Sequence, residues 1–468
     1  MSWACILLPH LALDGILRRR PDVVGPLVLV DGPANARTIV AANIPAREAG
    51  LRVGQRLTAA QALGTPFEAL PYDRDDAVRW HRFLAAVAYR YSSQVSLLPH
   101  AVVLEVSGSM GLFGPWPRFE SLLRADFTQL GFRHRIAAAP TPHAAYVLAG
   151  VHDGLAILTP PALRRACQGV PVTKARLPPA AIAALTSMGL RTLGQVLALP
   201  RDGLRRRFGN DLLMALDRLT GDRPHGLEPF VPPDVFDLRV ELLHEVENLG
   251  ALIFPLRRMT GDLAAYLAGR DGGVQRFLVQ LEHRAGLTTD VPVGLLSPER
   301  EPAMLFELAR GRLDHVRLPA PVVAMRLVAR DLPPFVPAGR DLFDERPAHA
   351  VSINQLRERL RARLGDEAVY RLRDTVDPRP ECAQSVEGEG PEAVEVYRRP
   401  TWLLDRPIPL RGPAPRILAG PERLETGWWD GGEVCRDYYA VETSQGQCAW
   451  AFCAPGEQSG WMIHGWFA

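Results

Sequence analysis

The chain has 468 residues, of which 47% are hydrophobic, 23% charged and 7% aromatic, a composition typical of folded globular proteins and too apolar for a disordered one. This length predicts about three or four domains, and no apolar run reaches the roughly 18 residues that a membrane-spanning helix needs. The first residues lack the basic region of a signal peptide and the six cysteines are widely scattered, so we expect a cytoplasmic protein that binds no membrane.

The net charge of +2 conceals an uneven distribution of charge along the chain. Residues 1–159 carry +3 and residues 231–340 carry −1, whereas residues 160–230 carry +6 and residues 341–468 carry −6. The short basic segment favours contact with nucleic acid, and the acidic end favours contact with protein.

Residues 1–160 predict a mixed α/β region. Strands are expected at 4–8, 27–30, 38–42, 101–106 and 135–139, and helices at 74–91, 116–130 and 142–150. Two short helical pieces are expected within 46–63, broken around Gly54. In the helix over 74–91, the apolar side chains near helical spacing, which predict its buried face, are Val78, Phe83, Val87 and Tyr91.

The remaining two thirds of the chain change character several times. Residues 178–222 predict two helices joined by residues 188–192, followed by a Pro- and Asp-rich linker at 229–237. Strands and helices then alternate over 238–330. The last predicted segments are an Arg/Glu-rich helix at 351–374, a flexible linker at 377–400 and a small β domain from 401.

Several motifs, in the same order along the chain, resemble those of the Y-family translesion DNA polymerases. Residues 42–54 (ANIPAREAGLRVG) are similar to the family's Tyr-Glu-Ala-Arg motif and the Gly-(Val/Ile)-Arg-x-Gly that follows it. Residues 91–95 and 104–108 resemble its Tyr-Ser-Pro-x-Val-Glu and Leu-Asp-Val-Thr motifs, and residues 185–209 resemble its helix-hairpin-helix thumb.

The resemblance implies an α/β (α+β) multidomain protein with a palm, fingers, thumb and little finger. We place the palm and fingers at 1–160, the helix-hairpin-helix thumb at 161–230 and the little finger at 231–335. A C-terminal extension follows, with a clamp-binding segment, helix and linker at 336–400 and the small β domain at 401–468.

The metal-binding carboxylates of the family are missing from this chain. Y-family enzymes hold two Mg²⁺ ions with three carboxylates, and these positions fall on Pro9, His100 and Ala101. The Arg of the triphosphate-binding motif is kept as Arg47, a vestigial triphosphate site, whereas its Tyr falls on Ile44. We therefore expect no metal, no cofactor and no nucleotide transfer, as in the catalytically inactive subgroup of this family found in bacterial mutagenesis cassettes.

An active, low-fidelity polymerase that uses displaced acids is the alternative. Asp14 lies five residues after Pro9, and Glu105 falls on a strand Asp that is not a metal ligand in the family; Asp31 lies at a turn. This alternative requires the displaced carboxylates to converge within about 4–5 Å in the palm.

The inactive subgroup implies an adaptor in translesion synthesis and damage-induced mutagenesis. Its expected partners are DNA, the sliding clamp, an error-prone DnaE-type polymerase and a RecA-like accessory protein. The predicted clamp-binding residues are Asp341, Leu342 and Phe343, because clamp peptides place an aliphatic-aromatic pair in an apolar pocket. Leu342 and Phe343 packing on the preceding domain is the alternative.

DNA contact is predicted for the thumb. The hairpin at Gly189 is expected to offer backbone N–H groups to a phosphate, and further phosphate contacts are expected from Arg205, Arg206 and Arg207. A solvated charged face is the alternative, and the −1 charge of the little finger fits DNA binding less well.

The cysteines and tryptophans of the tail have structural interpretations. The spacing of Cys435, Cys448, Cys453 and His464 lacks the paired pattern of zinc modules, so buried free cysteines are expected. Core packing and interface contacts are expected for six tryptophans, at positions 402, 428, 429, 450, 461 and 466.

Overall fold

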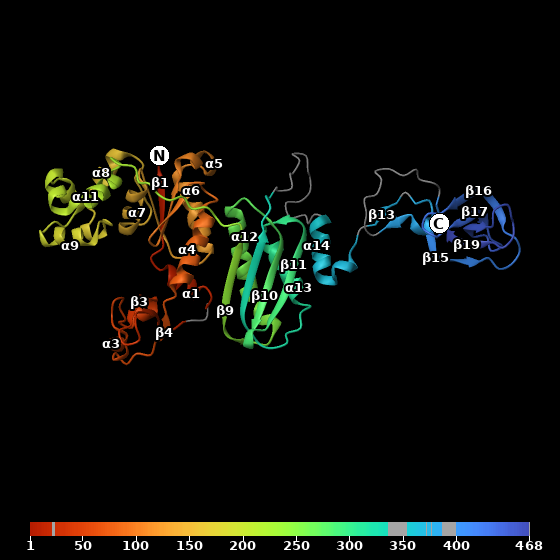
Figure 1. Cartoon of the computed structure of the whole chain (residues 1–468), viewed down its shortest axis with the longest axis horizontal. Coiled ribbons are helices and arrows are strands. Elements are labelled where there is room, and N and C mark those ends of the chain that lie inside the picture. The colour runs from red at the N-terminus through yellow and green to blue at the C-terminus, as the bar shows by residue number, and fades with distance from the viewer. Residues whose placement is uncertain (21–23, 336–352, 371, 376, 386–398, 468) are drawn as a thin grey trace. The chain divides into compact units, whose positions relative to one another are not determined.

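The computed structural model describes residues 1–20, 24–335, 353–370, 372–375, 377–385 and 399–467 (Figure 1). The chain divides into two compact units, Met1–Arg363 and Leu364–Ala468. The first unit contains both helices and strands, and the second contains mainly strands, so the predicted α/β multidomain class is confirmed. No helix within the described ranges is both long and apolar enough to cross a membrane. The predicted clamp-binding residues, Asp341, Leu342 and Phe343, lie outside the described residues.

The first unit is centred on a five-stranded sheet with order β5-β6-β1-β7-β8, here called the palm sheet. Its strands are β1 (Trp3–Leu7), β5 (Val95–Leu98), β6 (Ala101–Glu105), β7 (Arg135–Ala139) and β8 (Leu155–Ala156). The strand β1 lies in the middle and pairs antiparallel with both β6 and β7. It is buried on both faces, which explains its continuous apolar sequence.

Helices cover both faces of the palm sheet (Figure 1). One face, through Ala4 and Ile6, packs on α4 (Arg74–Ala88) and α6 (Trp116–Gln129). The other face, through Cys5 and Leu7, packs on α7 (Pro142–Val151) and on the helices that follow it, between residues 160 and 220. Alternate residues of β1 therefore contribute to two separate cores.

The buried face of α4 agrees with the predicted one except at Val78, since Val87 is buried and Phe83 packs against the core. Val78 is 48% exposed, whereas Ala77, Trp80 and Leu84 are buried together with Val87. The prediction was wrong at Val78 because hydrophobicity alone did not distinguish the side of the helix that carries Val78 from the neighbouring side that carries Ala77, Trp80 and Leu84. That buried side contains small and aromatic residues, which pack on α1 (Leu11–Leu17) and the palm sheet.

Two smaller groups of elements adjoin the palm sheet and are here called the fingers and the thumb. The fingers sheet has order β3-β2-β4, and its elements are β2 (Leu27–Asp31), β3 (Thr38–Ala42), β4 (Glu68–Pro71), α2 (Ile44–Glu48) and α3 (Leu57–Gln61). The thumb helices are α8 (Pro160–Gln168), α9 (Pro179–Ser187), α10 (Leu193–Leu197) and α11 (Arg201–Thr220). Instead of two helices over 178–222 there are three, and α11 is itself broken at Gly209, whose φ of 76° favours glycine.

A second layered structure follows the thumb, here called the little-finger sheet, with order β11-β10-β12-β9. Its strands are β9 (Phe236–Val246), β10 (Val274–His283), β11 (Thr288–Glu299) and β12 (Val322–Asp331), and its helices are α12 (Leu249–Gly269) and α13 (Pro302–Leu313). The helix predicted over 351–374 is shorter: it is observed as α14 (Ile353–Leu364), which ends before Gly365, whose φ is 101°.

The second unit contains an antiparallel five-stranded sheet with order β15-β19-β18-β17-β16, which confirms the predicted C-terminal β structure. Its strands are β15 (Trp402–Pro409), β16 (Arg416–Thr426), β17 (Val434–Glu442), β18 (Cys448–Cys453) and β19 (Met462–Trp466). A short hairpin of β13 (Arg373–Asp374) and β14 (Gln384–Ser385) lies within the segment around the predicted linker.

Candidate functional site

The three positions that lack carboxylates meet at one edge of the palm sheet, here called the palm edge. Leu7, at the end of β1, pairs with Ala101 at the start of β6 and with Arg135 at the start of β7. The Leu8 N–H donates a hydrogen bond of 2.8 Å to the carbonyl of His100, and Pro9 follows as an exposed residue. The structure therefore brings Pro9, His100 and Ala101 together.

The tight turn between β5 and β6 fixes His100 at this edge. His100 has a φ of 55°, and the carbonyl of the preceding Pro99 accepts a hydrogen bond of 2.8 Å from the hydroxyl of Tyr146. A ring nitrogen of His81 lies 2.9 Å from the carbonyl oxygen of Ala101. Side chains from α7 and α4 thus hold the turn from both sides of the sheet.

Arg47 reaches the palm edge from the fingers. Asn43 caps α2, with its side chain accepting from the Ala46 N–H at 2.9 Å, and this cap orients the first turn. The Nε of Arg47 donates to the carbonyl of Ala42 at 3.0 Å, and its Nη2 lies 3.4 Å from Nε2 of His10. Arg47, predicted as a vestigial triphosphate residue, therefore lies at the same edge as Pro9, His100 and Ala101.

The palm edge is electropositive. Burial first, and then the charges of Arg133, Arg47 and Arg135, lower the pKa of His10 to about 4, so this ring is neutral at pH 7. Arg47 and Arg135 are exposed and Arg133 is half-buried. No motif in the sequence indicated His10, Arg133 or Arg135 as site residues; their one local signal is their position beside the ends of predicted strands.

Asp14, the first displaced acid, is engaged in a structural ion pair. Its side chain is 3% exposed, and it accepts from Nε of Arg133 at 2.7 Å and from the Arg133 backbone N–H at 2.9 Å. Burial raises its pKa, against the lowering effect of Arg133. The carboxylate neutralises an arginine and is not free to hold a cation.

Glu105, the second displaced acid, lies at the other end of β6, where it pairs with Trp3. It lies four residue steps along β6 from Ala101, a span of about 13 Å at the usual rise per residue. Its oxygens accept from the backbone N–H groups of Ser107 at 3.0 Å and Gly108 at 3.2 Å. Burial raises the pKa of Glu105, but the hydrogen bond from the Ser107 hydroxyl and those from the backbone N–H groups outweigh burial and lower this pKa below its ordinary value.

The Mg²⁺ ions of the Y family do not fit these residues. Among the described residues, no group of three or more His, Cys, Asp or Glu side chains could hold a metal ion. At the palm edge a proline, a histidine and an alanine replace the carboxylates, and the nearby cationic side chains repel a divalent cation. Arginines at this position favour an anion such as a phosphate.

The thumb hairpin is closed by its own hydrogen bonds. The N–H groups of Gly189 and Leu190 donate to the carbonyls of Thr186 and Leu185, each at 3.0 Å. The hairpin thus ends α9 with a glycine cap that engages these two donors internally, and the phosphate contact at Gly189 stays a prediction. Gly189 itself is exposed, with a φ of 83°.

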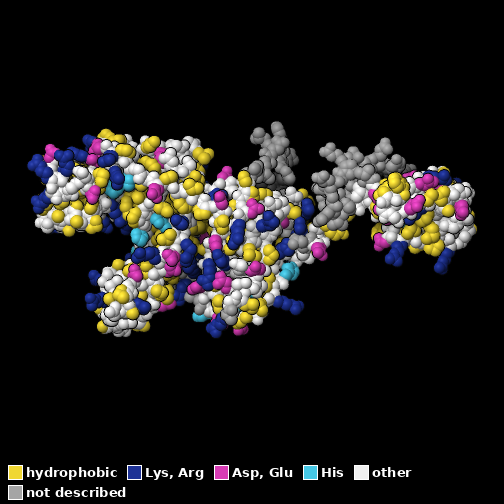
Figure 2. All heavy atoms as spheres, in the orientation of Figure 1, with side chains coloured by type: hydrophobic (Ala, Val, Ile, Leu, Met, Phe, Trp, Pro, Cys, Tyr) yellow, Lys and Arg dark blue, Asp and Glu magenta, His cyan; other side chains and the backbone are white. Residues whose placement is uncertain are grey.

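The three consecutive arginines predicted to contact DNA are exposed on α11. Arg205, Arg206 and Arg207 are all exposed, and Figure 2 shows dark-blue side chains gathered at the thumb end of this unit. Arg205 has only a loose ion pair with Asp202, at 3.6 Å. These guanidinium groups are free to contact a phosphate backbone.

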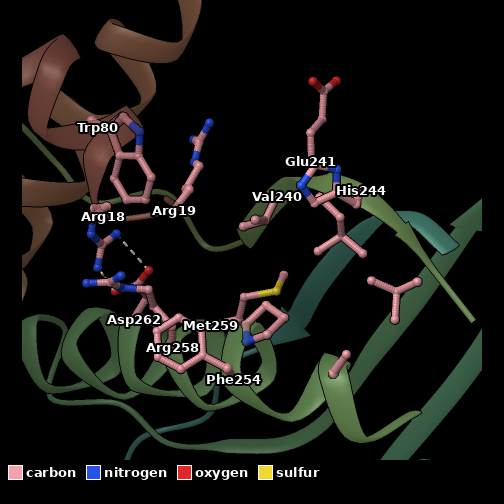
Figure 3. Close-up of a pocket in the computed structure, with 14 residues that line it drawn as sticks. Arg18, Arg19, Trp80, Val240, Glu241, His244, Phe254, Arg258, Met259 and Asp262 are labelled. Carbon is pink, nitrogen blue, oxygen red and sulfur yellow. Dashed lines mark hydrogen bonds and ion pairs between the residues drawn. The ribbon is translucent and has the colours of Figure 1, made fainter. Parts of the chain in front are cut away.

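A buried ion pair joins the palm to the little finger beside a cavity of about 240 Å³ (Figure 3). Arg18, which directly follows α1, donates to both carboxylate oxygens of Asp262 in α12, at 2.6 and 2.9 Å, and both side chains are 3% exposed. The Arg18 guanidinium lies 4.5 Å from the centre of the Trp80 ring. Charge pairing and stacking together fix α12 against the palm.

The cysteines and histidine of the tail do not converge into a metal site. Cys453 is buried and its thiol donates to the carbonyl of Glu457 at 2.7 Å, whereas Cys435 is exposed. The buried His464 ring lies 2.7 Å from the hydroxyl of Tyr438. These residues pack and hydrogen-bond within the β sheet.

Comparisons with known proteins agree with the motifs. Residues 12–150 match the model of the impB/mucB/samB family. The chain is 29% identical over 460 residues to Protein ImuB of two Caulobacter vibrioides strains, covering 89% of this chain and 100% of each relative.

Similar solved structures include DinB from Sulfolobus solfataricus (12% identity, 72% of this chain and 100% of that one, TM-score 0.41). An insertion ternary complex of Dbh DNA polymerase is also similar (12% identity, 71% of this chain and 99% of that one, TM-score 0.42). The resemblance that the motifs predict is therefore confirmed: this chain carries an impB/mucB/samB-family region at residues 12–150 and is similar to Protein ImuB along most of its length.

Proposed function

We propose that this protein is a non-catalytic, Y-family-like adaptor in translesion DNA synthesis and damage-induced mutagenesis, within the SOS response to DNA damage. The observation that carries the proposal is the palm edge, where Pro9, His100 and Ala101 occupy the carboxylate positions and Arg47 and Arg135 surround them. A two-metal phosphoryl transfer needs negative ligands at this place, and the side chains there are neutral or positive.

Primer extension tests the absence of catalysis. The full chain is incubated with primer-template DNA, the four dNTPs and either Mg²⁺ or Mn²⁺, and we expect no templated extension of the primer. Robust synthesis would overturn the proposal. In that case the variants Asp14→Asn and Glu105→Gln decide whether the displaced acids are responsible, since only the alternative of an active polymerase requires them.

The proposed partners are DNA, the sliding clamp, an error-prone DnaE-type polymerase and an ImuA-type RecA-like protein, all at the bacterial nucleoid. For the clamp we propose Asp341, Leu342 and Phe343 as the binding segment. Clamp binding in a pull-down is expected to disappear when Leu342→Ala and Phe343→Ala are combined. Unchanged binding would place the clamp site elsewhere.

For DNA we propose the exposed run of Arg205, Arg206 and Arg207, together with Gly189 of the thumb hairpin. Replacing the three arginines by alanine is expected to weaken DNA binding and to reduce the slope of log K against log salt by up to about 2.7, because each phosphate contact contributes about 0.9. Arg164→Ala, on the exposed surface of α8, is the matched control. An unchanged slope of log K against log salt would exclude the three arginines from the DNA interface.

A further inference from the structure

Two neighbouring tryptophans project from the loop between β16 and β17. Trp428 is 75% exposed and Trp429 is 56% exposed, whereas Trp450 and Trp461 of the same unit are 3% and 7% exposed. The two exposed rings meet edge to face, with their centroids 5.5 Å apart and an interplanar angle of 80°. Adjacent exposed indoles form an apolar surface that a folded protein usually keeps for a partner.

A buried arginine holds this loop in shape. Arg379, whose side chain is 9% exposed, donates to Asp430 at 2.5 and 3.1 Å and to the carbonyl of Gly432 at 3.3 Å. Its other edge pairs with Asp377 at 2.6 Å, and its guanidinium lies 5.9 Å from the centre of the Trp429 ring. This one side chain thus fixes the part of the loop that follows the two tryptophans.

Glycines allow the loop to close tightly around this arginine. Gly427 has a φ of 86°, and a Cβ there would lie 2.2 Å from the carbonyl oxygen of Gly432. A Cβ on Gly432 would lie 2.6 Å from Nη1 of Arg379. Because the backbone is already ordered, presenting the two rings to a partner costs little further conformational entropy.

The exposed charges beside the tryptophans are acidic, whereas Arg379, which lies near Trp429, is buried and paired with Asp377 and Asp430. Glu425, Asp430 and Glu433 are exposed, and the loop and its immediate flanks from 424 to 434 contain no basic residue. Residues 364–468 as a whole contain ten arginines and no lysine against seventeen acidic residues. This charge repels a phosphate backbone and complements a basic protein surface.

We propose that residues 425–433 form a docking hairpin that inserts Trp428 and Trp429 into an apolar pocket rimmed by Arg or Lys on a partner protein. The inference rests on the proposed adaptor function and adds to it the residues and the chemistry of one contact. It is separate from the clamp-binding segment, which lies before residue 344.

The test is a binding titration with the full chain, using the RecA-like accessory protein and the DnaE-type polymerase in separate experiments. Combining Trp428→Ala with Trp429→Ala is expected to weaken binding of one of them at least 100-fold. Trp402→Ala is the matched control, since Trp402 is 69% exposed on β15 at the opposite edge of the same sheet, and it is expected to change affinity less than twofold. Circular dichroism and limited proteolysis verify that both variants fold.

The outcomes separate this inference from the function on which it rests. If the wild-type chain binds a partner and the double variant binds it equally well, the docking hairpin is refuted and the adaptor function stands. If the wild-type chain binds neither protein, the adaptor function fails and the inference fails with it. If an oligo(dT) strand quenches the fluorescence of Trp428 and Trp429 at physiological salt, the hairpin binds nucleic acid and the proposal is overturned.

The acidic flanks give a second measurement. Glu425→Gln combined with Glu433→Gln is expected to weaken the same complex and to reduce the dependence of its association rate on ionic strength. An unchanged salt dependence would contradict a basic rim on the partner.

Discussion

Replacing Gly269 by alanine is expected to force the palm and the little finger apart. Gly269 ends α12, where a Cβ would lie 2.0 Å from the carbonyl oxygen of Ala86 in α4 and 2.9 Å from its carbonyl carbon. Ordinary contact requires more than 3 Å, so the two helices would have to separate by about 1 Å. Overpacking of this kind typically costs about 1–3 kcal/mol, which exceeds the gain in helix propensity of about 0.5–1 kcal/mol.

Gly261→Ala is the matched control, because it lies in the same helix and a Cβ there meets nothing within 4 Å. Hydrogen exchange measured by mass spectrometry on peptides from α4 and α12 reports the local free energy of opening. We expect faster exchange in Gly269→Ala and unchanged or slower exchange in Gly261→Ala. Equal protection of the two variants would refute the close packing of α12 on α4.

Two further predictions concern buried charges. Asp262→Ala leaves Arg18 buried without its carboxylate and is expected to lower the free energy of unfolding, measured by urea titration, by about 3–5 kcal/mol. The control Glu241→Ala breaks a pair whose carboxylate is 75% exposed and is expected to lower the free energy of unfolding by less than about 1 kcal/mol. Equal losses in the two variants would contradict the buried pair. Burial, followed by the charges of His225, Arg218 and Arg176, lowers the pKa of His143 to about 4. The His143 ring therefore binds a proton more readily in the unfolded chain than in the folded one. Its contribution to the free energy of unfolding is fully present above pH 6.5, and about 3 kcal/mol is lost as the pH falls toward 4. His143→Gln should flatten this part of the urea-midpoint profile, and an unaltered profile would show that another group is responsible.

The strands of the palm could be predicted within one or two residues from the sequence. Residues 4–8, 101–106 and 135–139 are short apolar runs, and the structure places strands at Trp3–Leu7, Ala101–Glu105 and Arg135–Ala139. Such runs are recognisable because a central strand is buried on both faces and needs apolar side chains at every position.

The contacts that join distant segments could not be predicted. Arg18 and Asp262 are 244 residues apart, and Asp14 and Arg133 are 119 apart, so no local pattern links either pair. The same limit applies to Gly189, where the hairpin motif indicated the turn but not that its N–H groups are consumed within it. Local patterns report periodicity and turns, whereas pairing depends on the three-dimensional fold.

The central position of β1 has a consequence for the order in which the protein folds during synthesis. Its partners β6 and β7 come about 100 and 130 residues later, so the middle strand of the palm remains without its two neighbours until both have left the ribosome. The fingers sheet, whose three strands lie between Leu27 and Pro71, can form first because its pairings are local. We therefore expect a nascent chain arrested before residue 135 to contain ordered fingers and an incomplete palm.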